Sequence, residues 1–351
     1  VSAFSCNPEM GSEPGVGHFF VSELMTRCDL TVITEEIQNR PAIERRQRED
    51  PAYAAIDFRY IPWPLLDEQG RRRDNLGFVR YYRTYRRWQR RAFHLAQELL
   101  RNSSYDLIHH LTMQGYREPG YLWQLDPPFI WGPVGGHGQL PWRYLHTLGW
   151  KGVLQQGSRN IYNWLQMRFH RRVYQAARKA QAIIANTTEE QRAFHRFHGV
   201  RPYVIAEFGT DPRAALPPRR RDVDSPLRIA WSGVHVPRKA LPILLNALGR
   251  VPDDAACEVH ILGDGPETVR WKRLAEKLGV TNRCTWHGRL PRTEAITVMA
   301  KCDVFALTSL LDGNSLVLLE AVSEGLPVIC HKICGFPDAV NDKCAILVPV
   351  D

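Results

Sequence analysis

The chain has 351 residues, a length that exceeds one cooperative domain, so two domains are expected. With 44% hydrophobic and 24% charged residues, the composition is that of an ordinary globular protein. No apolar run is long enough to span a bilayer, and no N-terminal segment has the order of a signal peptide. The eight cysteines, Cys330 and Cys334 included, lack metal-binding spacing and indicate buried thiols in a reducing compartment.

The first half alternates short β-rich runs with helical stretches such as residues 17–27 and 86–101. The expected strands lie in VSAFSC, DLTVIT, DLIHHL, PPFIWGPVGG, AQAIIANT and PYVIAEFG. This alternation predicts parallel strands with crossover helices. The glycine-rich GSEPGVG follows the first strand, so Gly15 and Gly17 could let the backbone approach an anion; a tight turn is the alternative. WGPVGGHG, residues 131–138, is a second strand exit and is expected to be a rigid loop.

The formal net charge is +9, and the positive charge gathers in residues 71–93 and 159–180. Both segments interleave arginines with Tyr, Trp and Phe at helical spacing. Such helices suit an anionic lipid surface, a phosphate-bearing substrate or nucleic acid. The alternative is a solvated face whose aromatic side chains turn toward the core.

Residues 210–226, rich in proline, arginine and aspartate, are predicted to be a linker. A second series of strands follows in RIAWSG, CEVHILGDG, CTWHGRL, DVFALTS, LPVICHK and AILVPV. The fold class is therefore α/β, with doubly wound parallel-sheet domains at 1–209 and 227–351. A ligand is expected in a central cleft between the carboxyl ends of their strands.

The first strand exit of the second domain contains a basic pair. Gly233 ends the strand, and Arg238 and Lys239 lie where a helix begins. Lone cations are disfavoured at that end of a helix, so we expect both side chains to face an anion. In HGRL, Arg289 and Leu290 leave a later strand and could offer backbone groups to a nucleotide base.

The stretch LTSLLDGNSLVLLEAVSEGLPVI contains two carboxylates, Asp312 and Glu320. The turn at Gly313 leads to Asn314 or Ser315, either of which can cap a helix. The helix is apolar all round, so we expect Glu320 to be buried and to lack a cation nearby. A ligand could rest a diphosphate on the helix amides and give hydroxyls to both carboxylates. The alternative makes Asp312 a turn residue and pairs Glu320 with a distant arginine.

Two of these segments carry a resemblance to a known family. Residues 232–248 resemble the G-R-x-x-x-x-K-G segment, and residues 309–329 the S-x-x-E-G-x-x-x-x-x-x-E-A-x-x-x-G-x-P-V signature, of the retaining glycosyltransferases of family 4. GSEPGVG, HHLT and IWGPVGG resemble acceptor-domain loops of one branch. The resemblance implies the GT-B architecture, in which two Rossmann-like domains face a central cleft.

The resemblance also implies roles for single residues. Lys239 would hold the donor diphosphate, Glu320 the ribose hydroxyls and Asp312 the transferred sugar, while His110 or His109 would lie near the reacting carbon. No D-x-D motif stands at a strand end, so we expect no metal; Lys239, Arg238 and the helix amides would neutralise the leaving group. No cofactor is expected beyond the nucleoside-diphosphate sugar, and front-face attack would need no covalent nucleophile.

Three features depart from the family pattern. Asp312 stands where glutamate is usual, so its reach is one methylene shorter. Val234 stands where the phosphate-binding arginine is expected, which leaves Arg238 as a substitute. The chain begins inside its first strand and stops at Asp351, so we expect it to be truncated at both ends.

We therefore expect a cytoplasmic hexosyltransferase that retains the anomeric configuration and serves polysaccharide, lipopolysaccharide or glycolipid synthesis. Its partners would be a nucleotide-sugar donor and a saccharide or lipid-linked acceptor. Residues 71–93 and 159–180 would hold it at the anionic inner face of the plasma membrane, with no nucleic acid bound. A GT-B-like nucleotide-sugar epimerase and a basic nucleic-acid-binding protein remain as alternatives.

Overall fold

The computed structural model describes residues 1–351 except 64–77, 208, 210–224, 253–254 and 351. The chain divides into two compact units. Unit 1 comprises Val1–His137 and Leu165–Glu207, and unit 2 comprises Gly138–Trp164 and Phe208–Asp351. Each unit is an α/β body with its own parallel sheet. The expected fold class, two parallel-sheet α/β domains, is confirmed.

Unit 1 is built on a seven-stranded parallel sheet with the order β3-β2-β1-β4-β5-β6-β7. Its strands are β1 (Ser2–Ala3), β2 (Thr31–Glu35), β3 (Asp57–Ile61), β4 (Ile108–Thr112), β5 (Phe129–Val134), β6 (Ala182–Ala185) and β7 (Tyr203–Val204). The order reverses direction between β1 and β4, which is the topological switch point of a doubly wound sheet.

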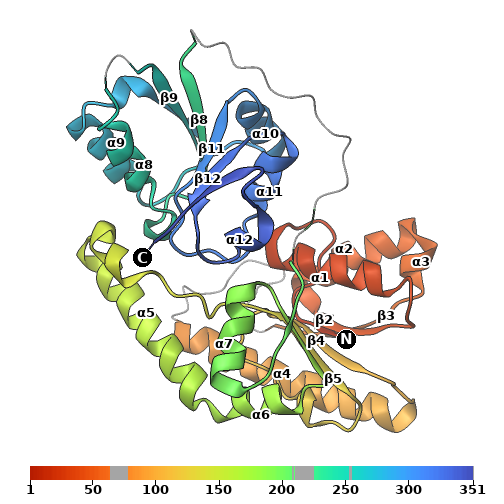
Figure 1. The fold of residues 1–351 in the computed structure, drawn as a ribbon. Coiled ribbons are helices and arrows are strands. Elements are labelled where there is room, and N and C mark those ends of the chain that lie inside the picture. Colours follow the sequence, from red (N-terminus) through yellow and green to blue (C-terminus); the bar gives the residue numbers. More distant parts are fainter. Residues whose placement is uncertain (64–77, 208, 210–224, 253–254, 351) are drawn as a thin grey trace. The chain divides into compact units, whose positions relative to one another are not determined.

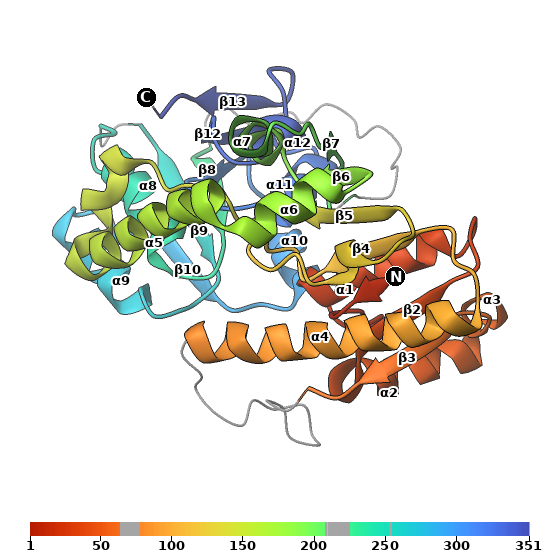
Figure 2. The ribbon, with the colours of Figure 1, turned by 90° about the horizontal axis from the view of Figure 1, so that it is seen from below.

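Helices cover the sheet of unit 1. They are α1 (Ser12–Leu24), α2 (Glu36–Glu49), α3 (Pro51–Ala54), α4 (Phe78–Asn102), α6 (Arg171–Lys179) and α7 (Thr188–His198), with the 3-10 turn η1 (Leu122–Gln124). The long helix α4 runs alongside β2 and β3 (Figure 2), where Tyr85 and Trp88 pack with Phe4, Ile33 and Ile61. This packing fixes the face that α4 turns to the core.

Unit 2 contains a six-stranded parallel sheet with the order β10-β9-β8-β11-β12-β13. Its strands are β8 (Leu227–Ser232), β9 (Cys257–Leu262), β10 (Cys284–Gly288), β11 (Val304–Leu307), β12 (Val328–His331) and β13 (Ala345–Val348). Because β8 and β11 are neighbours, the loops that follow them start at the same edge of the sheet. The sheet again switches direction there, the position at which open α/β sheets bind ligands.

The helices of unit 2 pack on both faces of its sheet. They are α8 (Leu241–Leu248), α9 (Thr268–Lys277), α10 (Arg292–Ala300), α11 (Leu316–Ser323) and α12 (Phe336–Ala339), with the 3-10 turns η3 (Pro237–Lys239) and η4 (Thr281–Arg283). Helices α8 and α9 lie side by side, as do α10 and α11 (Figure 1). One core forms around Trp231 and Trp271, and another around Phe305 and Leu318.

A segment that lies between β5 and β6 in sequence clusters with unit 2. It contains the 3-10 turn η2 (Trp142–Leu148) and most of α5 (Gly149–Phe169). The sequence analysis assigned residues 138–164 to the N-terminal domain. They cluster with unit 2 because Leu140, Leu145 and Leu148 pack into the core that contains Leu310. Most of the predicted linker, residues 210–224, lies outside the described part of the chain.

Candidate functional site

The carboxyl ends of β8 and β11 bring three charged side chains together. Lys239 Nζ lies 2.5 Å from Asp312 Oδ2, and Arg238 Nη1 lies 3.5 Å from Asp312 Oδ1 and 2.9 Å from the carbonyl oxygen of Leu311. The Lys239 side chain is 11% exposed and that of Asp312 is 18% exposed. With two cations against one carboxylate, the cluster keeps a positive charge that favours an anion.

Backbone contacts hold this cluster in place. Trp231 donates its indole N–H to Thr308 Oγ1 at 2.9 Å, and Thr308 Oγ1 donates to the carbonyl of Lys239 at 3.0 Å. The amide of Leu310 donates to the carbonyl of Arg238 at 2.9 Å. Strand-end residues of β8 and β11 therefore fix the direction of both basic side chains. Gly233 lies beside the Lys239 side chain, and a Cβ there would be in ordinary van der Waals contact with Lys239 Cδ, at 3.5 Å.

His235, in the loop between β8 and η3, packs beside Trp231 and was missed by the sequence analysis. Its side chain is fully buried among the rings of Trp231, Trp271 and Trp286, and its Nδ1 lies 2.7 Å from Thr268 Oγ1. Burial lowers the pKa of His235 to about 4, so the ring is neutral at pH 7. Four aromatic residues dispersed in the sequence offered no motif from which this packing could be recognised.

The helix α11 begins immediately after the cluster. Ser315 is its N-cap residue and is 5% exposed, but its side chain makes no capping hydrogen bond. Of the two expected N-cap residues, Asn314 and Ser315, it is therefore Ser315 that takes the position, without a hydrogen bond from its side chain. Gly313 is exposed in the preceding turn, and Asn314 is partly buried. Amides in the first turn of a helix have no intrahelical partner, so those of α11 suit an anion.

The expectation that Glu320 lacks a cation is wrong, and the alternative, in which it pairs with a distant arginine, is confirmed. Arg292 Nε lies 2.6 Å from Glu320 Oε1. Arg292 opens α10, which packs beside α11, and it lies 28 residues before Glu320 in the chain. The helix is also less buried than expected, since only Leu318 and Ala321 in it are fully buried. The side chain of Glu320 is 12% exposed and that of Arg292 is 67% exposed, so solvent reaches the pair from one side.

Two further predicted donor contacts lie beyond β10. Arg289 is exposed, whereas the Leu290 side chain is partly buried and packs against the core that contains Leu318. The side chain of Leu290 therefore serves the core of unit 2. Its backbone groups and those of Arg289 follow the strand end, as the sequence analysis expected.

The glycine-rich segment of unit 1 differs from its prediction. Helix α1 already begins at Ser12, so Gly15 and Gly17 are helical and form no loop that could wrap an anion. A Cβ at Gly17 would lie 1.9 Å from the carbonyl oxygen of Ser5, and one at Gly15 would lie 2.5 Å from that of Met10. Glycine is needed at both positions because the helix packs directly against the loop that follows β1.

Both histidines predicted near the reacting carbon are buried in β4. His110 is 1% exposed and His109 is 6% exposed. His109 Nε2 lies 2.6 Å from the carbonyl oxygen of Gly132, and neither ring nitrogen of His110 has a hydrogen-bond partner among the described residues. Burial lowers the pKa of His109 to about 4 and that of His110 to about 3. In this geometry neither imidazole reaches the surface of unit 1, which leaves the catalytic role without structural support.

The two arginine-rich segments behave differently. Residues 71–77 lie outside the described part of the chain, but α4 turns Tyr85 and Trp88 to the core and leaves Arg83, Arg87 and Arg91 exposed. The aromatic side chains of α4 thus turn toward the core, while its exposed arginines stay accessible to an anionic surface. Helix α5, in contrast, presents exposed apolar side chains, which are Trp150, Leu154, Ile161, Tyr162, Trp164, Leu165 and Phe169.

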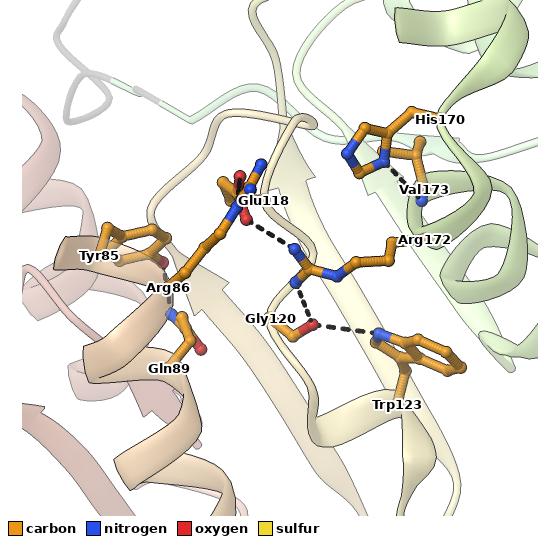
Figure 3. A network of polar contacts seen from close by, with 9 residues as sticks. All are labelled: Tyr85, Arg86, Gln89, Glu118, Gly120, Trp123, His170, Arg172 and Val173. Carbon is orange, nitrogen blue, oxygen red and sulfur yellow. Dashed lines mark hydrogen bonds and ion pairs between the residues drawn. The ribbon is translucent and has the colours of Figure 1, made fainter. Parts of the chain in front are cut away.

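A buried ion-pair network, which the sequence analysis missed, links α4 to α6 within unit 1 (Figure 3). Glu118 is 3% exposed in its side chain, and its carboxylate lies 2.6 Å from Arg86 Nε and 3.1 Å from Arg172 Nη1. Arg172 also donates to the carbonyl of Gly120 at 3.0 Å, as does Trp123 through its indole N–H at 3.1 Å. These contacts tie the loop after β4 to both helices.

No helix in the described ranges is both long and apolar enough to cross a bilayer. No group of three or more His, Cys, Asp or Glu side chains in the same ranges is placed to hold a metal ion.

Comparison with known sequences places unit 2 in context. The family model described as glycosyl transferases group 1 matches residues 217–350. A curated relative, D-inositol 3-phosphate glycosyltransferase of Mycobacterium leprae (strain Br4923), is 31% identical over 184 residues. This match covers 48% of the present chain and 42% of the relative, so the chain matches less than half the length of that protein.

Comparison with solved structures extends over both units. The apo form of the lipopolysaccharide outer core galactosyltransferase WaaB is similar with a TM-score of 0.61 and 16% identity, covering 96% of this chain and 81% of that one. Anabaena HepE in complex with UDP is similar with a TM-score of 0.59 and 18% identity. The match covers 97% of this chain and 84% of that one. Similarity at this level of identity establishes the fold, and the expected GT-B architecture of two Rossmann-like domains is thereby confirmed.

Proposed function

Since residues 217–350 match the family model described as glycosyl transferases group 1, we propose that the protein moves a sugar from a nucleoside-diphosphate sugar to an acceptor hydroxyl. The observation that supports this most is the convergence of Lys239, Arg238 and Asp312 at the carboxyl ends of β8 and β11. The start of α11 follows this cluster directly. A cluster of net positive charge beside a helix N-terminus suits a diphosphate.

Binding of the donor would change the ion-pair partners of the charged side chains in the cluster. A diphosphate carries more negative charge than one carboxylate, so it would replace Asp312 as the partner of Lys239 and Arg238. The released Asp312 would then accept hydrogen bonds from the transferred sugar. Glu320 would accept from the ribose hydroxyls after its contact with Arg292 loosens. Each of these changes breaks an ion pair that the structure shows within the protein.

We infer that transfer proceeds with retention at the anomeric carbon. As the bond to the sugar breaks, negative charge develops on the diphosphate, where Lys239, Arg238 and the α11 amides would stabilise it. An acceptor hydroxyl that attacks from the face the diphosphate leaves passes its proton to the departing diphosphate oxygen, so the step needs no nucleophile from the protein. The residues of the protein would thus bind the donor and stabilise the developing charge, and none of them would form a covalent intermediate.

Ligand-induced thermal shifts would identify the donor. A nucleotide sugar present at 100 times its dissociation constant should stabilise the protein by about 2.7 kcal/mol. The donor so identified is then incubated with and without saccharide acceptors, and nucleotide release is measured. Release that depends on acceptor supports transfer, whereas an interconverted sugar without released nucleotide would indicate an epimerase. A protein that no nucleotide or nucleotide sugar stabilises would contradict the proposal.

We further propose that the acceptor is a saccharide or a lipid-linked saccharide, and that α4 faces an anionic membrane. The exposed Arg83, Arg87 and Arg91 support this, because each cation near an anionic surface contributes about 1 kcal/mol. Sedimentation with vesicles tests the idea. Replacing the three arginines by glutamine should lower the fraction bound to anionic vesicles at low salt. Equal binding of the unmodified protein to neutral and anionic vesicles would argue against it.

A further inference from the structure

A second basic site lies on unit 2, on the outer side of α8 and α9. These two helices and the η2 turn enclose a cavity of about 790 Å³. We call it the α8–α9 groove, and its lining residues are His146, Thr147, Pro242, Ile243, Asn246, Ala247, Arg250, Arg270, Trp271, Arg273, Leu274 and Lys277. The volume falls within the range of about 300–1,000 Å³ that is typical of sites for small ligands.

The charge of the α8–α9 groove has one sign. Four lining residues are Arg or Lys and none is Asp or Glu. Arg270 pairs with Glu267 at 3.0 Å, outside the lining. The side chains of Arg250, Arg273 and Lys277 form no ion pair or hydrogen bond with any other residue that the structure describes. Three cations around one hollow, none paired with an acidic residue in the described ranges, favour an anionic occupant.

Exposed apolar side chains lie beside the groove. Trp142 in η2 is 54% exposed, and Trp150 and Leu154 at the start of α5 are 70% and 64% exposed. Arg270 joins this segment to the groove, because its Nη1 donates to the carbonyl of Leu148 at 3.3 Å. Position 149 is also tightly packed there, since a Cβ on Gly149 would lie 2.9 Å from Arg270 Nη2. Leu148 and Gly149 therefore place the start of α5, with Trp150 one residue further on, beside the basic groove.

We propose that this surface docks unit 2 on a membrane containing anionic lipid. The headgroup phosphate occupies the α8–α9 groove, and Trp142, Trp150 and Leu154 enter the interfacial layer. Tryptophan prefers the boundary between headgroups and acyl chains, and exposed apolar side chains beside cations are the pattern of interfacial anchors. A soluble phosphate compound would account for the cations alone. The lipid surface accounts for the tryptophans as well, which is why we favour it.

This docking surface differs from the α4 face. It belongs to the donor-binding unit, it combines charge with exposed tryptophan, and it uses none of the residues assigned to sugar transfer. Its test needs neither donor nor acceptor. Failure of the docking proposal and failure of the proposed transferase activity are therefore distinguishable.

The test compares two double variants by vesicle sedimentation. Arg273→Gln/Lys277→Gln removes two charges from the groove, and Lys301→Gln/Lys343→Gln removes two from a different hollow of unit 2. Vesicles are either pure phosphatidylcholine or phosphatidylcholine partly replaced by phosphatidylglycerol. The groove variant should bind the anionic vesicles roughly 10- to 30-fold more weakly than the unmodified protein, because two interfacial cations are lost. The control variant should bind as the unmodified protein does.

Two further measurements sharpen the result. Trp150→Ser/Leu154→Ser should weaken binding to anionic vesicles while the melting temperature stays unchanged, because both side chains are exposed. Inorganic phosphate, added at constant ionic strength, should not displace the protein from the vesicles. Displacement by phosphate would show that the groove binds the free ion instead. An equal loss in the control variant, or no binding of the unmodified protein to anionic vesicles, would also overturn the proposal.

Discussion

At the scale of single residues, both proposed donor carboxylates already have cationic partners in the ligand-free protein. Asp312 contacts Lys239 and Arg238, and Glu320 contacts Arg292. These pairs keep partly buried charges compensated until a ligand arrives. The donor must therefore compete with contacts inside the protein, and variants of the two members of a pair should affect binding differently.

Arg292→Gln tests the role of the pair with Glu320. Because 67% of the Arg292 side chain is exposed, the pair should contribute no more than about 1 kcal/mol to stability. The variant should bind the nucleoside diphosphate as tightly as the unmodified protein or more tightly, since it removes a competitor for Glu320. Glu320→Gln, in contrast, should bind it more weakly. Calorimetry measures both, and an equal loss in the two variants would make Arg292 a positioning or binding residue.

Asp312→Asn tests whether Asp312 contacts the transferred sugar and not the diphosphate. The change removes the negative charge beside Lys239, so affinity for the bare nucleoside diphosphate should stay equal or rise. Turnover should fall, because the proposed contact with the transferred sugar is lost. Binding by calorimetry and turnover by nucleotide release are compared in the same preparation. A large loss of affinity for the bare nucleotide would show that Asp312 holds the cluster in its active shape.

At the scale of secondary-structure elements, the ion pairs of Glu118 with Arg86 and Arg172 connect α4 and α6. Glu118→Gln leaves Arg86 and Arg172 without their shared carboxylate. The free energy of unfolding should fall by about 2 kcal/mol, less than for a fully buried pair because both arginines reach solvent. Denaturant titration measures it. Glu36→Gln, which removes an exposed pair with Arg40, is the control and should cost roughly 0.5 kcal/mol or less. Equal effects would mean that the network is not a structural link.

The elements of the fold could be predicted largely from the sequence, because alternating apolar strands and helices leave a local signal. The start of α1 was missed because Pro14 and the glycines were taken for a loop, although proline is well tolerated in the first turn of a helix. The same alternation of strands and helices predicts that Lys239 and Asp312 lie just after the ends of strands. Partners such as Arg292 and Arg172 could not be predicted, since helix packing in three dimensions brings them to their carboxylates.

At the scale of the whole molecule, buried histidines should make the protein sensitive to acid. Burial lowers the pKa of His109, His198 and His235 to about 4 and that of His110 to about 3. In the unfolded chain these rings take up protons below a pKa of about 6.5. Between those values the unfolded state binds more protons than the folded state. The contribution of these neutral histidines to the free energy of unfolding is therefore fully present above about pH 6.5 and is lost as the pH is lowered.

His110→Phe should reduce this sensitivity. Between pH 7 and pH 5 one such histidine costs up to about 2 kcal/mol of stability, and phenylalanine has no proton to take up. The fall in melting temperature over that range should therefore be smaller in the variant, as measured by calorimetry. His198→Phe provides a second case if His110→Phe does not fold, and His94→Gln, at an exposed position, is the control. An unchanged pH dependence in both phenylalanine variants would contradict the explanation.

The central claim is that Lys239 faces the diphosphate of a nucleotide-sugar donor. The most direct measurement is calorimetry of Lys239→Ala with the nucleoside diphosphate that gives the largest thermal shift, and with its nucleoside. The variant should lose about 2 kcal/mol with the diphosphate, as expected for a charge-assisted contact, and almost nothing with the nucleoside. Lys301→Ala, which removes a lysine charge between α10 and β11, should bind both as the unmodified protein does. Equal losses for diphosphate and nucleoside in Lys239→Ala, or no loss for either, would contradict the account.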